Sequence, residues 1–234
     1  MNAAMTGISI FGASGRMGQA IALALEDCDD ARIAEHRPDG FVDFSVPDAL
    51  EKHLATAVAA GKPLLIGTTG LGPDHKAMID DAAGKIALIQ ASNTSLGVTL
   101  LAALARQAAA RLGADWDIEI VEMHHRLKVD APSGTALMLG RAAAEGRGIA
   151  LDDAALGGPR SGTRAPGAIG FASLRGGSVA GDHQVIFAGE GERLELGHRA
   201  ESRAIFAHGA IAGLLWLIGK PPGRYTMADV LDLR

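Results

Sequence analysis

The sequence is poor in cysteine, in aromatic residues and in positive charge, and each shortage excludes a class of protein. One cysteine, Cys28, stands among 234 residues, so no disulfide can form within the chain. Aromatic side chains make up 4% of the residues, which is few for the stacking platforms that bind single-stranded nucleic acid. The formal net charge of −5 gives no attraction to nucleic acid or to an anionic membrane. We therefore expect neither kind of partner.

Long apolar runs are also missing. No uninterrupted apolar segment approaches the ~20 residues of a membrane-spanning helix. Residues 1–6 lack the basic region and apolar stretch of a signal peptide. Together with the single cysteine, these features predict a cytoplasmic protein. Hydrophobic residues nevertheless make up 48% of the chain, enough to form a sizeable core.

Strand-like and helix-like segments alternate through residues 1–94. Short apolar runs predict strands over 7–11, 41–46, 63–66 and 85–90, and helical spacing predicts helices over 19–26, 48–60 and 74–83. Strands that alternate with helices indicate a parallel sheet covered on both faces. We predict an α/β, Rossmann-like dinucleotide-binding domain over residues 1–94.

The pattern changes after residue 94. A long apolar helix is predicted over 95–112, a half-solvated strand over 116–123, and a helix that follows Pro132 and runs to about Ala144. Residues 151–168 are rich in Gly, Pro and Arg and predict a loop, and strands are expected over 169–174, 178–188 and 192–198. We therefore predict a second, α+β domain on a mixed sheet over 95–203. An apolar helix, Ala204–Leu217, opens a final segment, 204–234, that returns to the first domain.

A glycine-rich loop, Gly12-Ala13-Ser14-Gly15-Arg16-Met17-Gly18, follows the first predicted strand and opens the first helix. Glycines allow the backbone to approach a pyrophosphate, and the helix N-terminus offers free N–H groups with a positive dipole end. Arg16 adds a full positive charge. The spacing G-x-x-G-x-x-G is one residue longer at the first gap than the strict dinucleotide fingerprint, but its position favours a cofactor site over a simple turn.

An acidic residue about 20 positions further along holds the adenosine ribose in such folds. Glu35 lies 17 residues after Gly18, and His36 and Arg37 follow it. Glu35 could bind the ribose and Arg37 a 2′-phosphate. An ordinary solvated turn explains the same residues equally well.

Two further loops follow predicted strands. Gly67-Thr68-Thr69-Gly70 comes after the strand at 63–66, and Ala91-Ser92-Asn93-Thr94 comes after the strand at 85–90. Small hydrogen-bonding residues at the carboxyl edge of a parallel sheet could line a nicotinamide and its ribose. By themselves, these loops are better explained as ordinary strand-to-helix turns.

The densest group of chemically active residues lies at 119–136. His124, His125 and Lys128 stand at the end of a strand, and Ser133 follows Pro132 at the start of a helix. Adjacent histidines on a strand point to opposite faces, and no set of structural zinc ligands lies nearby, so we predict no metal site. A titratable histidine beside a cation and a helix N-terminus suits a small polycarboxylate that must receive a proton. The alternative is a helix cap, a solvated basic turn and a core histidine.

The segment HHRLKVDAPSGTA resembles the signature of the dihydrodipicolinate reductase family. The resemblance spans nearly the whole chain, because it extends to the segments IFGASGRMG, VDFS, IGTTG, ASNTSLGV, GFASLRGGSVAGDH and LGHRAESRAIFAHGAIAGLLWL. It implies a Rossmann-like domain completed by the C-terminal helix, and a mixed-sheet domain that forms a homotetramer. It also implies reduction of a cyclic hydroxy-imine dicarboxylate by NADH or NADPH, with loss of water, in lysine biosynthesis through diaminopimelate.

The resemblance also assigns residues to roles. It implies that His124 donates the proton and that Lys128 is its catalytic partner. It implies that four residues bind the substrate carboxylates: His125, Ser133, Gly134 and Thr135. The residues implied to contact the cofactor are Gly12, Ala13, Ser14, Gly15, Arg16, Met17, Gly67, Thr68, Thr69, Ala91, Ser92, Asn93 and Thr94.

The chain departs from the family between the first helix and VDFS, where family members carry a much longer stretch and this chain has only Asp29 to Gly40. We expect Ala31–Ala34 to remain as a second strand and the sheet to be shortened at that edge. Glu35 and Arg37 would then act with opposite preferences at the adenosine end, so both cofactors should work.

Two other functions fit parts of the sequence. A different two-domain Rossmann oxidoreductase would be favoured by a nucleophilic cysteine in the second domain, but Cys28 lies in the first. A non-catalytic dinucleotide sensor would keep the glycine-rich loop but would not need His124 together with Lys128.

Overall fold

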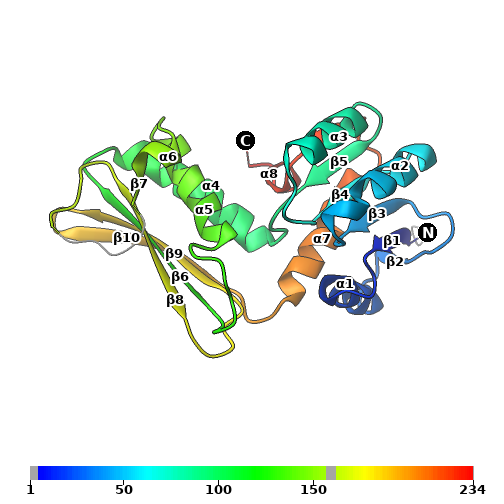
Figure 1. Ribbon diagram of the computed structural model, residues 1–234, viewed down its shortest axis with the longest axis horizontal. Coiled ribbons are helices and arrows are strands. Elements are labelled where there is room, and N and C mark those ends of the chain that lie inside the picture. Colours follow the sequence, from blue (N-terminus) through cyan, green and yellow to red (C-terminus); the bar gives the residue numbers. More distant parts are fainter. Residues whose placement is uncertain (1–4, 157–161, 234) are drawn as a thin grey trace. The chain divides into compact units, whose positions relative to one another are not determined.

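The computed structural model describes residues 5–156 and 162–233 and divides into two compact units. The first comprises Met1–Leu96 and Arg203–Arg234, and the second comprises Gly97–Ser202. The last helix and its tail thus belong with the N-terminal part of the chain (Figure 1). Among the described residues, no helix combines the length and apolarity that crossing a membrane requires.

The first unit is built on a six-stranded, all-parallel sheet in the order β11-β5-β4-β3-β1-β2 (Figure 1). Its strands are β1 (Thr6–Phe11), β2 (Ala31–Ile33), β3 (Gly40–Asp43), β4 (Leu64–Ile66), β5 (Ala87–Gln90) and β11 (Gly223–Tyr225). Its helices are α1 (Arg16–Glu26), the short 3-10 helix η1 (Pro47–Ala49), α2 (Leu50–Ala60), α3 (Pro73–Ala83), α7 (Ala204–Leu217) and α8 (Met227–Val230).

Alternating strand residues supply two cores, one on each face of this sheet. Val42, Leu65 and Ile89 pack with α1 and α7 on one face. Their neighbours on the opposite face, including Leu64 and Leu88, pack with α2 and α3. The predicted Rossmann-like layering of helix, parallel sheet and helix is confirmed.

The shortened segment between α1 and β3 crosses the sheet without a helix. β2 and β3 lie on opposite sides of β1, and Ile8 pairs with both Ile33 and Gly40. The connecting residues 34–39 therefore cross β1 close to Gly7, whose N–H donates to Asp39 Oδ2 at 2.9 Å. A Cβ on Gly7 would lie 2.8 Å from the Cβ of Ala34. The crossing is possible because Gly7 has no side chain.

The second unit is built on a mixed sheet in the order β10-β9-β6-β8-β7. β6 (Asp117–His124) pairs parallel with β8 (Ile169–Arg175) and antiparallel with β9 (Asp182–Gly189). β10 (Glu192–Arg199) and the two-residue β7 (Ala155–Leu156) complete it. The helices α4 (Leu96–Leu112), α5 (Gly134–Gly146) and α6 (Leu151–Ala154) accompany this sheet, and residues of all three join its strands in one core. The predicted α+β unit on a mixed sheet is confirmed.

Several predicted boundaries were wrong. Residues 151–156 form α6 and β7 rather than a loop, and residues 157–161 of that predicted loop lie outside the described chain. β9 begins at Asp182, not at residue 178, and α1 begins at Arg16, inside the glycine-rich loop. β11 and α8 were not predicted. β7, β11 and α8 have two to four residues, too few to display a period, and they lack the apolar runs that marked the short strands β3, β4 and β5.

The crossing over β1 generates a stability prediction. Gly7→Ala should lower the free energy of unfolding by about 1–3 kcal/mol, because the new methyl group overlaps the Ala34 side chain. Each kcal/mol lowers the melting temperature of a chain of this size by about 2–4 °C. Thermal unfolding of the purified protein measures the effect.

A double variant and a control isolate the cause. Adding Ala34→Gly to Gly7→Ala removes the overlapping methyl group and should recover part of the loss. Gly84→Ala is the control, since its Cβ would meet nothing closer than 3.4 Å. If the double variant is no more stable than Gly7→Ala, the Ala34 contact is not the cause.

Candidate active site

The carboxyl end of β6 carries the candidate active site. Side chains alternate along this strand, so Glu122 and His124 share a face with the buried Ile118 and Ile120. Near the end of the strand that face becomes polar, and Glu122 is 1% exposed there. A buried carboxylate beside a buried histidine requires partners.

Glu122 is bound from three sides. Its Oε2 lies 2.6 Å from His124 Nδ1, and its Oε1 accepts the Ser133 N–H at 3.2 Å. Two guanidinium nitrogens of Arg175, Nη1 and Nη2, donate to it at 2.8 Å, in a two-pronged ion pair. Burial by itself raises the pKa of the Glu122 carboxyl. Hydrogen bonds from Arg175, Ser173 and His124 outweigh burial and lower that pKa to about 2, so the group is a carboxylate at neutral pH.

His124 is oriented by this carboxylate. Its Nδ1 donates to Glu122, which leaves Nε2 as the nitrogen free for proton exchange. Burial lowers the pKa of His124, and the contact with Glu122 partly opposes that effect. A Cβ on Gly181 would lie 3.1 Å from Nε2, so the absence of a side chain at this position keeps the nitrogen uncovered.

The start of α5 lies beside this pair. Ser133 caps the helix, because its Oγ accepts the Ala136 N–H at 3.1 Å, and the same Oγ lies 3.1 Å from His183 Nε2. Gly134 and Thr135 form the first turn of α5, at the positive end of the helix dipole. The structure thus brings Ser133 together with His124 through Glu122.

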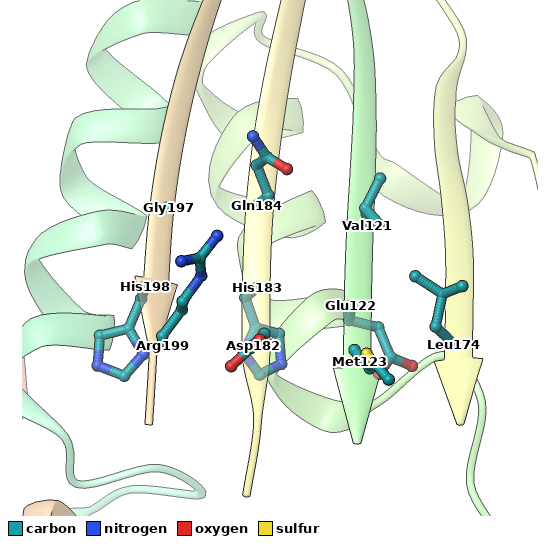
Figure 2. Close-up of a pocket in the computed structure, with 10 residues that line it drawn as sticks. All are labelled: Val121, Glu122, Met123, Leu174, Asp182, His183, Gln184, Gly197, His198 and Arg199. Atoms are coloured by element: carbon teal, nitrogen blue, oxygen red, sulfur yellow. The ribbon is translucent and has the colours of Figure 1, made fainter. Parts of the chain in front are cut away.

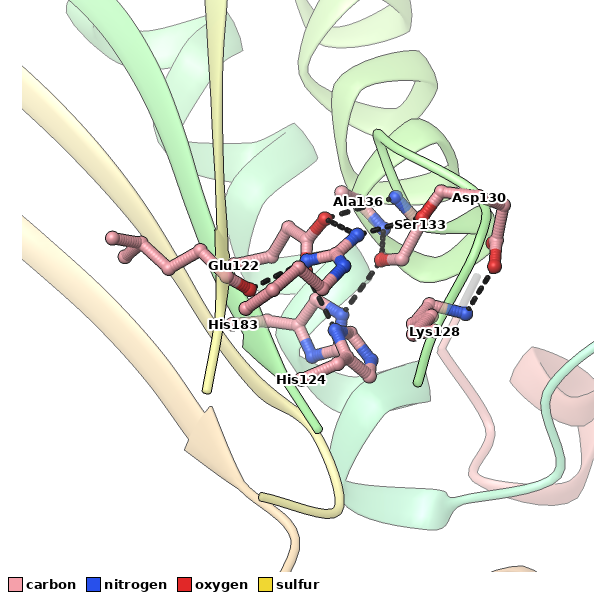
Figure 3. Close-up of polar contacts among 9 residues, drawn as sticks. Glu122, His124, Lys128, Asp130, Ser133, Ala136 and His183 are labelled. Atoms are coloured by element: carbon pink, nitrogen blue, oxygen red, sulfur yellow. Dashed lines mark hydrogen bonds and ion pairs between the residues drawn. The ribbon is translucent and has the colours of Figure 1, made fainter. Parts of the chain in front are cut away.

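The other two predicted residues lie on the loop after β6. Lys128 forms an ion pair with Asp130 at 2.8 Å, and its positive charge lowers the pKa of that carboxyl through this contact (Figure 3). The same charge acts on His124 and favours its neutral form. The backbone N–H of His125 donates to Val179 O at 2.8 Å, which fixes the start of the loop, and the His125 side chain is half-buried.

The residues predicted to contact a cofactor lie after β1, β4 and β5, at the carboxyl edge of the parallel sheet. Gly12 turns the chain with a positive φ of 80°, and the Gly15 N–H donates to Gly12 O at 3.0 Å. Gly15 caps α1 without any side-chain hydrogen bond, so this helix end keeps its N–H groups available for an anion. Arg16 begins the helix. The predicted context of strand, glycine-rich turn and helix is confirmed.

Two of the predicted cofactor residues have side chains that are engaged within the protein. Thr94 donates from its hydroxyl to Phe206 O at 2.7 Å, and Thr68 binds Asp43 Oδ1 at 3.1 Å. Both are nearly fully buried. A contact between either residue and a cofactor would therefore come from the backbone. Thr69 and Ser92 are exposed, whereas Gly67, Ala91 and Asn93 are half-buried.

A buried carboxylate missed by sequence analysis ties the loop after β3 to the loop after β4. Asp43, at the end of β3, is fully buried and accepts from the Ser45 hydroxyl at 2.6 Å and from the Ser45 N–H at 2.9 Å. His53 Nδ1 lies 2.9 Å from the same carboxylate, and Thr68 is its third partner. The polar residues Asp43 and Ser45 at a strand end were the available signal.

Glu35 and Arg37 lie in an exposed turn after β2. Ala31–Ile33 is a strand parallel to β1, as expected, but Ile33 pairs with Ile8, three residues before β1 ends at Phe11. At about 3.3 Å per residue, β2 ends about 10 Å short of the glycine-rich loop along the strand direction.

Sequence analysis also missed Glu122, Arg175 and His183 as members of the His124 cluster. The spacing of Glu122 two positions before His124 was a usable signal, since it places both on one face. Arg175 and His183 reach the cluster through strand pairing, because His124 pairs with Arg175 and Glu122 with His183. Within the described residues, no group of three acidic, histidine or cysteine side chains is arranged to hold a metal ion.

The fold and the site together define a class of protein. A parallel Rossmann-like sheet with a glycine-rich turn, joined in one chain to a unit with a buried histidine held by a carboxylate, is typical of dinucleotide-dependent oxidoreductases.

Comparison with known proteins identifies the family. Residues 28–94 match the family model "Dihydrodipicolinate reductase, N-terminus", and residues 97–231 match "Dihydrodipicolinate reductase, C-terminus". The chain belongs to the dihydrodipicolinate reductase family.

Relatives named 4-hydroxy-tetrahydrodipicolinate reductase support the same membership. One from Zymomonas mobilis is 54% identical over 246 aligned positions, covering 97% of each chain. One from Caulobacter vibrioides is 48% identical, also over 97% of each chain. The first alignment has more positions than the 234 residues of this chain, so that relative carries residues that this chain lacks.

A solved structure matches the fold. It is described as dipicolinate-bound dihydrodipicolinate reductase from Paenisporosarcina sp. TG-14, with a TM-score of 0.79 and 23% identity, covering 96% of this chain and 98% of that one. A probable dehydrogenase from Thermotoga maritima shares the fold less closely, with a TM-score of 0.60 and 13% identity.

The buried histidines generate a prediction about pH. Burial, and then the nearby charge of His124, lower the pKa of His183 to about 4, and burial also lowers the pKa values of His124 and His198. The unfolded chain therefore binds more protons than the folded chain below about pH 6.5. The free energy of unfolding should fall as pH falls from about 6.5 to 4, as urea titrations at a series of pH values would measure.

Variants of single residues show which groups cause this dependence of stability on pH. His183→Gln should reduce the slope in that window by about one proton. Glu122→Gln should instead remove the loss of stability that its depressed pKa predicts between pH 4.5 and about 2. His208→Gln, which removes an exposed histidine of α7, is the control. An unchanged slope in His183→Gln would contradict the assignment.

Proposed function

We propose that this chain is a 4-hydroxy-tetrahydrodipicolinate reductase, the activity named for its relatives. In this role it reduces the cyclic hydroxy-imine dicarboxylate with NADH or NADPH and, with loss of water, yields tetrahydrodipicolinate for lysine synthesis through diaminopimelate. The observation that carries the proposal is the buried Glu122–His124 pair beside the Ser133 end of α5. It combines a proton donor with an anion-binding helix end at one edge of a sheet.

The nicotinamide cofactor fits the first unit. The uncapped N-terminus of α1 and Arg16 would bind the pyrophosphate. A bound reduced nicotinamide supplies the hydride. The residues proposed to hold the cofactor are Gly12, Ala13, Ser14, Gly15, Arg16, Met17, Gly67, Thr68, Thr69, Ala91, Ser92, Asn93 and Thr94.

His124 is proposed as the proton donor. Hydride addition to a conjugated imine leaves an electron-rich nitrogen or carbon that must be protonated, and a positioned acid contributes about 10²–10⁴ in rate. Glu122 holds the imidazole so that Nε2 presents the proton. The Lys128 ammonium would stabilise the developing negative charge.

The substrate carboxylates are proposed to bind at the start of α5. The hydroxyl of Ser133 and the N–H groups of Gly134 and Thr135 suit an anion, and His125 would add a further donor from the preceding loop. Dipicolinate, the ligand named for the solved relative, is a dicarboxylate of the same class.

Cofactor choice is proposed to be weak. Glu35 repels a 2′-phosphate and Arg37 attracts one, but both lie in an exposed turn where solvent screens their charge. We infer that both NADH and NADPH serve as reductants, with modest discrimination between them.

The mixed sheet is proposed to form a homotetramer of the cytoplasmic enzyme. One face of it packs with α4 and α5, whereas the other carries Val121, Met123 and Leu174 around a hollow of about 480 Å³ (Figure 2). Leu174 is 49% exposed. A second copy could cover this face through the same residues, as symmetric interfaces do.

The assay that tests the function follows oxidation of NADH and NADPH in the presence of enzymatically generated 4-hydroxy-tetrahydrodipicolinate. Turnover with this substrate supports the proposal. Turnover only with an unrelated semialdehyde would favour a different Rossmann oxidoreductase. Cofactor binding without any turnover would favour a dinucleotide sensor.

His124→Gln should reduce kcat by about 100-fold or more, because a general acid is lost. Its folding and its affinity for the dinucleotide should remain those of the parent. His125→Gln is the comparison, and it should act mainly on KM. Steady-state kinetics of both variants measure these effects. If kcat of His124→Gln stays within a few-fold of the parent, another residue is the general acid.

Glu35→Ala should shift the ratio of kcat/KM for the two cofactors toward NADPH, because a carboxylate that repels the 2′-phosphate is removed. The shift should not exceed about fivefold, since an exposed charge contributes about 1 kcal/mol at most. Kinetics with both cofactors, on parent and variant, measure the ratio. No change, or a change toward NADH, would exclude Glu35 from the adenosine site.

A further inference from the structure

His183, on β9, is a buried histidine to which the proposed function gives no role. It is 6% exposed, and its ring meets that of His124 edge-on, with 5.1 Å between ring centroids. Its Nε2 lies 3.1 Å from Ser133 Oγ. Its Nδ1 is buried and has no hydrogen-bond partner in the described part of the chain. When only one ring nitrogen of a histidine has a hydrogen-bond partner, this limits which of the two nitrogens can carry the hydrogen.

Ser133 is the residue that this constraint affects. A hydroxyl has one hydrogen to donate and two lone pairs that accept. One lone pair of Ser133 Oγ accepts the Ala136 N–H. The contact with His183 then has two possible directions. Either Ser133 donates its hydrogen to His183 Nε2, or it accepts one from it.

The buried Nδ1 decides between these directions. Burial holds the His183 ring neutral by lowering its pKa to about 4, so one ring nitrogen carries the hydrogen. If Nδ1 carried it, a donor would be buried without an acceptor, which is rare and costly in folded proteins. If Nε2 carries it, only an unused lone pair is buried. The second arrangement is the more stable one.

We propose that His183 is a positioning residue, which donates from Nε2 to Ser133 Oγ and so leaves the Ser133 hydroxyl hydrogen free to bind a substrate carboxylate. Both lone pairs of Ser133 are then occupied, by Ala136 N–H and by His183. The hydroxyl can act only as a donor, which is what an anion requires. The opposite orientation would present the remaining oxygen lone pair to the carboxylate and repel it.

This inference rests on the proposed function, because it takes Ser133 as a carboxylate ligand. The test measures binding of pyridine-2,6-dicarboxylate (dipicolinate) by calorimetry in the presence of saturating NADH. His183→Asn should raise the dissociation constant about 10-fold, as expected for loss of a hydrogen bond to a charged group. The shorter Asn amide cannot reach Ser133. His183→Gln, whose amide nitrogen can occupy the place of Nε2, should stay within about threefold of the parent.

A double-mutant cycle shows whether His183 acts through Ser133. Ser133→Ala alone should weaken dicarboxylate binding at least as much as His183→Asn. Adding His183→Asn to Ser133→Ala should then have little further effect, because the hydroxyl to be oriented is gone. Additive losses would overturn the proposal, and so would parental affinity in His183→Asn. NADH affinity and melting temperature serve as folding controls.

If the variants fold poorly, the position of the hydrogen on His183 can be measured in the parent protein instead. Long-range ¹H–¹⁵N correlation spectra of histidine-labelled protein distinguish the two neutral forms of His183, and hydrogen on Nδ1 would overturn the proposal. If the parent neither binds the dicarboxylate nor turns over the substrate, the proposed function fails. If it does both and the His183 variants match it, this inference alone fails.

Discussion

The candidate site of the second unit depends on the hydrogen bonds and the ion pair that the buried carboxylate of Glu122 makes. This carboxylate joins three segments that are distant in the sequence: the end of β6, the end of β8 and the start of α5. Arg175 keeps it ionised, and an ionised acceptor both fixes the His124 ring and holds the Ser133 N–H. Removing either charge of a buried pair leaves the other uncompensated, at a cost that can reach about 3–5 kcal/mol. Structure and chemistry therefore rest on the same contact.

A similar arrangement occurs in the first unit. The fully buried Asp43 binds Ser45, His53 and Thr68 and so ties the loop after β3 to the loop after β4. In both units a carboxylate near a strand end binds groups of the irregular segments around it. Irregular loops cannot satisfy their own polar groups as helices and strands do, so a buried acceptor replaces regular pairing there. This explains why several residues around each candidate site bind the protein rather than face solvent.

Sequence patterns predicted the long helices and the short apolar strands β3, β4 and β5, but they missed β7, β11 and α8. Long helices such as α4 and α7 carry enough turns to show their period, and the glycine-rich turn has a recognisable context. β7 and β11 have two and three residues, and only their pairing with β8 and β5 creates them. The site followed the same rule. His124 and Ser133 lie in one continuous motif of the sequence. Arg175 and His183 come from other strands, and the pairing register of those strands with β6 brings them to the site. No local sequence pattern encodes that register.

The cluster also settles which of two neighbouring histidines holds a proton. Burial lowers the pKa of both His124 and His183, and their rings are too close for both to be charged at little cost. Glu122 contacts His124 directly and opposes the effect of burial there, whereas His183 contacts only a neutral hydroxyl. A proton entering the cluster therefore resides on His124 and leaves His183 neutral. One carboxylate thus distinguishes the two rings, because only His124 contacts it directly.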